Sequence, residues 1–422
     1  MRSRRSTYRG EVTATWYEVL AEVVNRAHLA GGSELPAILD AAGSRLGISA
    51  ELYLADLPQH RLHPLTTDGS PGIAIGSTVA GRAFQHVEIV AWRDRDTGRP
   101  ALWVPVVDGT HRVGVLYLVL PEGGDPDDTD LRGFCWTLGG LLGYVITTKL
   151  SQSDLLHRVR RPKDLSVSAE LLWEMMPPQT FATPHMTVSA IVEYYDEAGG
   201  DGYDYNADGD SGYFAVFDAT GHDIQAGLVC STALAATRNA RRCGHDLATI
   251  ARDADAVVRA NTSHSRFATA VLARLDFATG LLTYVNAGHP PPLVLRGGRA
   301  AKLLTGGHRL PLGLQHLNRT SVATEPATER LEPGDRLLLY TDGVTEARNS
   351  RGEHFGLERL ADFVIRHSAA GLPAPETLRR ISHAVLDHQA GHLQDDATLM
   401  FVEWPTPSHP HLLPAESSDV LR

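Results

Sequence analysis

The chain has 422 residues, of which 43% are hydrophobic and 21% are charged, a composition typical of globular proteins. At roughly 100–200 residues per domain, this length predicts two or three domains. The formal net charge of −11 argues against a nucleic-acid partner, because nucleic-acid-binding surfaces are basic. The three cysteines form no CxxC pair and no zinc-ligand spacing, so we expect reduced thiols.

Two segments could in principle serve targeting or membrane insertion. Residues 1–13 are basic, and because no apolar run follows them we interpret them as a disordered N-terminus and not as a secretory signal. Phe134–Thr148 is the most apolar stretch, but its fifteen residues fall short of the ~20 that cross a bilayer. It is predicted to be the buried face of a helix. The sequence therefore predicts a cytoplasmic protein without a membrane partner.

The region from residue 14 to residue 150 is predicted to hold a helix pair, an antiparallel sheet and an exit helix. The expected elements are two helices, Trp16–Ala30 and Glu34–Leu46, three strands, Glu51–Ala55, Ala101–Val107 and Arg112–Val119, and the exit helix over Asp125–Arg161. The last two strands are separated by Asp108-Gly109, a dipeptide that favours a tight hairpin turn.

Two stretches of this region carry a resemblance. GIAIGSTVAGRAF (Gly72–Phe84) and WVPVVDGTHRVGVLYL (Trp103–Leu118), in this order of elements, resemble a GAF domain. The resemblance implies an α/β sensor domain over residues 14–150 that binds a small ligand. It also implies a homodimer, because such domains often dimerise. No cysteine or histidine here is interpreted as a haem or chromophore ligand.

Residues 151–180 are predicted to form a helical linker. Its helix should end at Pro177-Pro178, because proline cannot continue a helix. The apolar residues between Leu171 and Met176 have helical spacing, which fits either packing into a core or a dimer-forming signalling helix. The second domain is expected at residues 181–404, and the Pro-, Ser- and His-rich residues 405–422 are predicted to be disordered.

The second domain combines strands with two predicted helix pairs. The expected helices are Ala226–Arg242, Leu247–Thr262, Gly356–His367 and Ala374–Ala390. Between and around them run apolar strands that end in turn signals.

Carboxylates recur at the ends of these strands. The residues are Asp201, Asp218, Asp342, Asp395 and Asp396. Strands that end in carboxylates can bring them together at one edge of a sheet, where they repel one another unless cations neutralise them. All-oxygen ligand sets suit hard cations such as Mg²⁺ and Mn²⁺. The pattern therefore predicts a two-metal site for phosphoester chemistry.

The second domain contains an ordered set of motifs: AGGDGYDY (Ala198–Tyr205), FDATGHDIQA (Phe217–Ala226), YVNAGHPPPLVL (Tyr284–Leu295), LPLGL (Leu310–Leu314), LEPGDRLLLYTDGVTEARN (Leu331–Asn349) and QDDATLMFV (Gln394–Val402). In this order they resemble the PPM metal-dependent protein phosphatases, in their SpoIIE- and RsbU-like branch, and the resemblance covers about residues 165–404. The resemblance implies an α+β fold, namely a β-sandwich of two antiparallel sheets flanked by helix pairs and preceded by the GAF-like domain.

The resemblance also implies roles for the carboxylates. Asp218 would bridge two Mn²⁺ or Mg²⁺ ions, and Asp201 would bind one of them. The carbonyl of Ala219 would be a further ligand, while Asp342 and Asp395 would hold the second ion. Asp201 and Asp218 would act in catalysis through the water that the two ions activate.

Four residues are expected to support these ligands: Asp396, His222, Gly200 and Gly343. Which of Asp395 and Asp396 binds metal stays open. His222 and His289 fit either general acids or loop-orienting residues, and we favour the second role for both.

Two departures from the family pattern are visible. Asp223 stands where the family commonly has glycine, which places an extra carboxylate near the site. No phosphate-binding arginine is evident near Asp201, as is general in this branch.

The function implied is hydrolysis of phosphoserine or phosphothreonine on a partner protein, of the STAS-type anti-sigma-factor antagonist class, under control of the sensor domain. A catalytically weak or inactive phosphatase fold that acts as a regulatory binding module is the alternative. A two-metal hydrolase acting on nucleotides is disfavoured, because the chain has no P-loop sequence.

Overall fold

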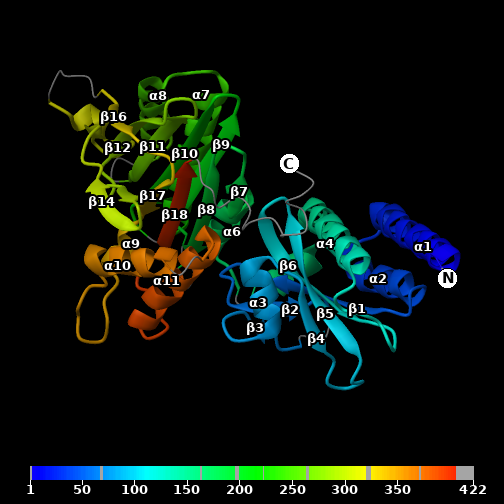
Figure 1. Cartoon of the computed structure of the whole chain (residues 1–422). Coiled ribbons are helices and arrows are strands. Elements are labelled where there is room, and N and C mark those ends of the chain that lie inside the picture. The colour runs from blue at the N-terminus through cyan, green and yellow to red at the C-terminus, as the bar shows by residue number, and fades with distance from the viewer. Residues whose placement is uncertain are drawn as a thin grey trace. The chain divides into compact units, whose positions relative to one another are not determined.

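A computed structural model describes residues 2–66, 70–161, 164–194, 199–221, 223–262, 266–319, 325–369 and 372–404. The described chain divides into two compact units, one within residues 1–163 and the other within residues 164–409. Each unit has its own hydrophobic core and is considered separately (Figure 1).

The first unit is built on one antiparallel sheet. Its helices are α1 (Arg2–Leu29), η1 (Gly32–Glu34), α2 (Leu35–Ser44), α3 (Val79–His86), α4 (Thr129–Leu150) and α5 (Asp154–Arg160). Its strands are β1 (Ser49–Ala55), β2 (Arg61–Pro64), β3 (Ile73–Ala74), β4 (Val90–Arg93), β5 (Pro100–Asp108) and β6 (His111–Val119). The strands lie in the order β3-β2-β1-β6-β5-β4. The predicted hairpin is confirmed, since Asp108 pairs with His111 across the β5–β6 turn.

Helix α4 shows why the apolar stretch Phe134–Thr148 belongs to a core. Its residues Phe134, Leu138, Leu142 and Ile146 are buried at helical spacing. Gly139 and Gly143 let the helix approach the sheet closely. A Cβ at Gly139 would lie 2.3 Å from the carbonyl oxygen of Pro105, and one at Gly143 would lie 2.0 Å from that of Val107. Across the described ranges, no helix is both long enough and apolar enough to span a bilayer.

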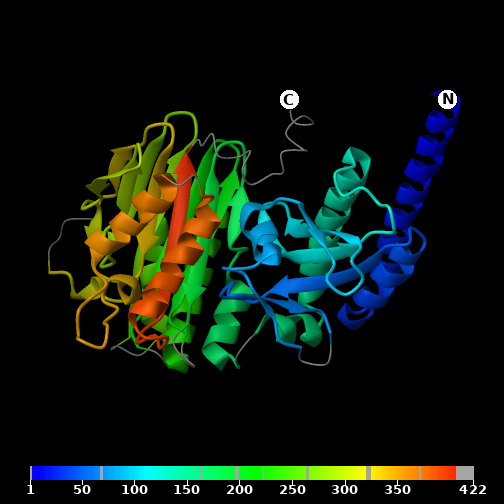
Figure 2. The same cartoon turned by 60° about the horizontal axis from the view of Figure 1, so that its bottom comes forward.

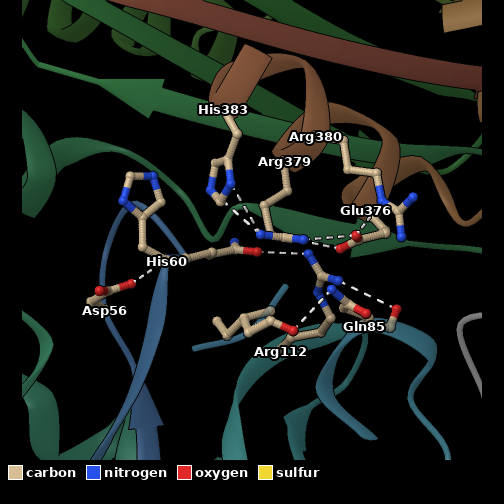
Figure 3. Close-up of polar contacts among 10 residues, drawn as sticks. Asp56, His60, Gln85, Arg112, Glu376, Arg379, Arg380 and His383 are labelled. Carbon is tan, nitrogen blue, oxygen red and sulfur yellow. Dashed lines mark hydrogen bonds and ion pairs between the residues drawn. The ribbon is translucent and has the colours of Figure 1, made fainter. Parts of the chain in front are cut away.

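Polar contacts fix the turn between β1 and β2 and attach α3 to the sheet of this unit (Figure 3). The carboxylate of Asp56 accepts hydrogen bonds from the backbone N–H groups of His60 and Arg61, which closes the connection between β1 and β2. Arg112 on β6 donates to the side chain of Gln59 at 2.7 Å and to the carbonyl of Gln85 at 3.5 Å. The sheet and α3 are thereby joined through one guanidinium.

The first unit differs from expectation in two places. Helix α1 begins at Arg2, whereas disorder was predicted for residues 1–13. The helix expected over Asp125–Arg161 is divided, because α5 restarts after Ser153, whose hydroxyl caps it by accepting from the N–H of Leu156.

The second unit contains two six-stranded sheets. Its helices are α6 (Val167–Met175), α7 (Ile224–Arg242), α8 (Leu247–Asn261), η2 (Gln315–Leu317), α9 (Asp342–Thr345), α10 (Leu357–Ala369) and α11 (Ala374–His388). Its strands are β7 (Thr180–Ala182), β8 (Thr187–Glu193), β9 (Asp201–Asp208), β10 (Ser211–Ala219), β11 (Ala268–Asp276), β12 (Leu281–Ala287), β13 (Leu293–Arg296), β14 (Arg299–Leu303), β15 (His308–Arg309), β16 (Ala327–Arg330), β17 (Asp335–Tyr340) and β18 (Ala397–Trp404). One sheet has the order β15-β12-β11-β10-β9 with β16 beside β12, and the other has the order β14-β13-β17-β18-β8-β7.

The two sheets pack face to face as a sandwich (Figures 1 and 2). Buried side chains such as Tyr203, Phe214, Leu339 and Met400 fill the space between them. Helices α7 and α8 cover the outer face of the first sheet, and α10 and α11 cover the outer face of the second. All described strand pairs of the two sheets are antiparallel except β12 with β15. The expected α+β sandwich flanked by helix pairs is confirmed.

Helix α11 also carries a charged cluster of its own (Figure 3). The carboxylate of Glu376 accepts from Arg379 at 2.8 and 2.9 Å and from Arg380 at 2.7 Å. These spacings of three and four residues place the side chains on one side of the helix, where such pairs stabilise it.

The linker predicted at residues 151–180 is divided between the units. Helix α5 falls in the first unit and α6 in the second. Leu172 of α6 is fully buried in the core that α6 shares with α7, which favours core packing over an exposed signalling helix for this residue. The predicted disordered tail, residues 405–422, lies outside the described residues.

Candidate active site

The site begins where two neighbouring strands of the first sheet meet. Asp201 is the first residue of β9, and Asp218 is directly opposite it near the end of β10. The N–H of Ala219 donates to the carbonyl of Gly200 at 3.1 Å. A side chain at Gly200 would crowd this contact, because a Cβ there would lie 3.0 Å from the Ala219 carbonyl oxygen. The predicted ligands Asp201, Asp218 and Ala219 are therefore adjacent.

The second sheet supplies the other carboxylates. Strand β17 ends at Tyr340 and α9 begins at Asp342, while Asp395 and Asp396 immediately precede β18. Gly343 allows the two segments to touch, because a Cβ at this position would lie 1.9 Å from the carbonyl oxygen of Asp396 and 3.4 Å from the Cβ of Asp395. This close approach explains the glycine in the Asp-Gly pair and sets Asp342 beside Asp395.

Asp201 is the residue that joins the two sheets. Its Oδ2 accepts hydrogen bonds from the hydroxyl of Thr341 at 2.7 Å and from the hydroxyl of Thr398 at 2.8 Å. The carboxylate of Asp396 accepts from the N–H of Gly200 at 2.6 Å. Since Thr398 lies on β18, Thr341 directly follows β17 and Asp396 directly precedes β18, these bonds fasten the start of β9 to the ends of two strands of the second sheet.

The electrostatics show how closely the carboxylates are gathered. Burial, together with the nearby Asp342, Asp395 and Asp396, raises the pKa of Asp218 to about 8. The pKa of Asp201 is also raised, first by burial and then by Asp218 and Asp396. The pKa of Asp342 is raised by burial and by Asp395. Each of the three groups thus resists ionisation because of burial and its acidic neighbours.

A hydrogen-bonded chain leads from Asp218 to His289. The Thr269 hydroxyl lies 3.4 Å from Oδ2 of Asp218 and 2.7 Å from Nδ1 of His289. The Asn286 side chain accepts from the N–H of His289 and donates to its carbonyl, which closes the turn. Burial lowers the pKa of His289 to about 4, so the imidazole is neutral at neutral pH. This geometry favours the loop-orienting role for His289, and His222 lies outside the described residues.

The donor set fits hard divalent cations. The side chains gathered around Asp218 are carboxylates and a hydroxyl, the oxygen donors that Mg²⁺ and Mn²⁺ prefer. The charged groups that shift the pKa of Asp218 are all acidic, and a cation would relieve the repulsion among them. As they stand, no three Asp, Glu, His or Cys side chains in the described part of the chain are close enough to enclose a metal ion. The metal ligands therefore stay a prediction.

Three threonines of the site were not singled out from the sequence. Thr341 and Thr398 bind Asp201, and Thr269 binds Asp218. Two of them could have been found from the sequence, because they lie within the quoted motifs beside the predicted ligands. Thr341 precedes Asp342, and Thr398 follows the Asp395-Asp396 pair after one residue. Thr269 lies outside those motifs.

Comparison with known proteins identifies the domain. Residues 208–405 match the family described as "Stage II sporulation protein E (SpoIIE)". Protein IcfG of Synechocystis sp. is 32% identical over 138 residues, which are 32% of this chain and 20% of that protein. The phosphoserine phosphatase RsbU of Bacillus subtilis is 25% identical over 239 residues, which are 56% of this chain and 69% of that protein.

A solved structure of the RsbU and RsbW domains of a Mycobacterium tuberculosis protein is similar, with 28% identity and a TM-score of 0.44. The similarity covers 52% of this chain and 62% of that chain. The match to the SpoIIE family spans Asp218, Asp342, Asp395 and Asp396, whereas Asp201 lies just before it. Residues 208–405, within the second unit of this chain, therefore form a SpoIIE-type domain.

Proposed function

We propose that this chain is a metal-dependent protein serine/threonine phosphatase that hydrolyses phosphoserine or phosphothreonine on a partner protein. The observation that carries the proposal is the meeting of Asp201, Asp218, Asp342 and Asp395 at the junction of the two sheets, within a domain of the SpoIIE type. The relative RsbU is named a phosphoserine phosphatase.

In the proposed reaction, some residues of the site would bind the metal ions and others position these ligands. Asp201, Asp218, Asp342, Asp395 and the carbonyl of Ala219 would hold two ions of manganese or magnesium. When bound, such ions supply the positive charge that activates a water molecule and stabilises the phosphoryl oxygens. Thr341 and Thr398 hold the carboxylate of Asp201 in place, and Thr269 does the same for Asp218. Neutral His289 orients Thr269 through its Nδ1.

The substrate and the control of the enzyme extend the proposal. As the family resemblance of the motifs implies, the substrate would be a phosphorylated STAS-type anti-sigma-factor antagonist. The first unit would act as a GAF-like sensor domain that binds a small ligand, dimerises and regulates the phosphatase. We also propose that the sensor domain spans residues 14–150, that the phosphatase domain spans residues 181–404, and that the protein is cytoplasmic.

The test is phosphate release from a phosphoserine-containing protein substrate with manganese in excess, comparing the wild type with Asp218→Ala and Asp342→Ala. Both substitutions should bring activity below detection, because each removes a proposed metal ligand. Asp208→Ala is the matched control, since it removes an exposed carboxylate at the far end of β9, the strand that Asp201 begins.

An inert wild type, together with an inert isolated second unit, would overturn the phosphatase and favour the regulatory binding module. Activity that survives in Asp218→Ala would equally contradict the assignment of the site.

A further inference from the structure

Arg266 joins the connection between β10 and α7 to the start of β11. It lies just before β11, and its Nη1 donates to the carbonyl of Thr220 at 2.8 Å. Its Nη2 donates to Oδ2 of Asp223 at 2.7 Å. One guanidinium therefore contacts both ends of the short segment that leads from β10 to α7.

Asp223 uses its two carboxylate oxygens for two different purposes. Oδ1 accepts from the N–H of Ala226 at 3.1 Å and so caps the start of α7. Oδ2 is the atom that pairs with Arg266. The carboxylate that departs from the family pattern is thus fully engaged, and its charge is balanced by a cation.

The segment between Thr220 and Asp223 adjoins the proposed metal ligands. Thr220 is fastened to Phe267 by three hydrogen bonds of 3.0–3.2 Å, which extend the β10–β11 pairing past Ala219. On the site side, a Cβ at Gly200 would meet the carbonyl oxygens of Ala219 and Gly221 at 3.0 and 3.1 Å. A shift of this segment would therefore move the Ala219 carbonyl and disturb its contact with Gly200.

Gly221 shows how closely Arg266 covers the segment. Its φ is +91°, a conformation that favours glycine, and a Cβ there would lie 2.4 Å from Nη1 of Arg266. The guanidinium rests directly on the backbone at this point. Loss of Arg266 would uncover the segment and leave the Asp223 carboxylate without its cation.

We propose that Arg266 and Asp223 form a clasp that positions Thr220 and Gly221 of this segment, and with them the Asp218 carboxylate and the Ala219 carbonyl, for metal binding. The inference rests on the proposed metal-dependent function. Both residues act through the segment, so they are positioning residues and not catalytic ones. The clasp also accounts for a carboxylate at position 223, since the arginine that neutralises it belongs to the same structure.

The test measures Mn²⁺ binding to the full chain without substrate, by the electron paramagnetic resonance signal of free Mn²⁺. Asp223→Asn keeps the helix cap but removes the charge, and Arg266→Lys keeps the charge but loses the two-pronged contact. Arg266→Ala should weaken Mn²⁺ binding by about 10–100-fold, as is usual when a group that orients a metal ligand is lost. Asp223→Asn should weaken it less, and the double variant should be no worse than Arg266→Ala.

Arg296→Ala is the matched control. Arg296 forms a similar pair of contacts with Asp335 and Glu332, but Asp335 begins β17, whereas Asp342 follows the other end of that strand. This variant should lose thermal stability and bind Mn²⁺ as the wild type does.

Three results would overturn the clasp: unchanged Mn²⁺ binding in Arg266→Ala, additive losses in the double variant, or an equal loss in Arg296→Ala. A wild type that binds Mn²⁺ but releases no phosphate would contradict the proposed phosphatase function, and the Mn²⁺-binding comparison of the variants would still test the clasp. A wild type that binds no Mn²⁺ would overturn both.

Discussion

The two sides of the site are held in different ways. Asp201 is 2% exposed, and two threonine hydroxyls fix its Oδ2. Asp395 on the other side is exposed, and its side chain accepts a local hydrogen bond from the N–H of Asp396. The position of Asp201 is thus set by contacts across the two sheets, whereas the position of Asp395 is set by the path of the backbone at Gly343. Substitutions on the two sides should therefore differ in their effects on phosphatase activity and on the metal requirement.

The largest effect is expected on the exposed side, from Gly343→Ala. The new methyl group would collide with the Asp396 carbonyl, 1.9 Å from the position of the Cβ, and would push α9 away from β18. Since misplacing a reacting group by ~1 Å can cost about 10²-fold in rate, phosphate release should fall at least that far.

The matched control for this variant is Gly133→Ala. Gly133 is exposed on α4 and has no atom near its Cβ position, so activity should be unchanged. Normal activity in Gly343→Ala would contradict the close approach of the two segments.

An intermediate effect is expected on the buried side, from Thr341→Val and Thr398→Val. Each change keeps the shape of the side chain but removes one donor to Asp201. The concentration of Mn²⁺ for half-maximal activity should rise by about 10–100-fold in each variant.

Thr237→Val provides the comparison for the threonine variants. It removes a buried hydroxyl bonded to the Leu234 carbonyl within α7, so it should lower the melting temperature without changing the metal requirement. Equal metal requirements in all three variants would show that the threonines serve stability alone.

The smallest effect is expected on the pH dependence of the folding stability of the metal-free protein. The folded-state pKa of Asp218 is about 8, against an ordinary value of 3.8. A carboxyl with a raised pKa favours the folded state at low pH, and this contribution is lost as the pH rises through that range. In EDTA, the stability of the wild type should therefore decrease from about pH 4 to about pH 8.

Asp218→Asn separates this contribution from other titrations. In EDTA the variant should melt several degrees above the wild type near pH 8, with the difference shrinking toward pH 4. Thermal unfolding at matched ionic strength checks this, and a difference that does not vary with pH would refute it. Added Mn²⁺ should stabilise the wild type and not the variant.

The sequence alone predicted the local features of this protein. Apolar spacing located α7, α8, α10 and α11 to within a few residues, and the Asp-Gly signal located the β5–β6 hairpin. These features depend on neighbouring residues, so their periodicity and turn chemistry are legible along the chain. The motif order also indicated the SpoIIE-type domain and the carboxylates at its strand ends.

Only the tertiary structure decided how the site is held together. Thr341 and Thr398 lie 140 and 197 residues from Asp201 in the sequence, and Arg266 lies 43 residues from Asp223. No local pattern reports such pairs, because they arise from the register of β9 with β10 and from the packing of one sheet on the other. The same physical reason explains why the extra carboxylate at Asp223 was recognised from the sequence while the arginine that balances it was not.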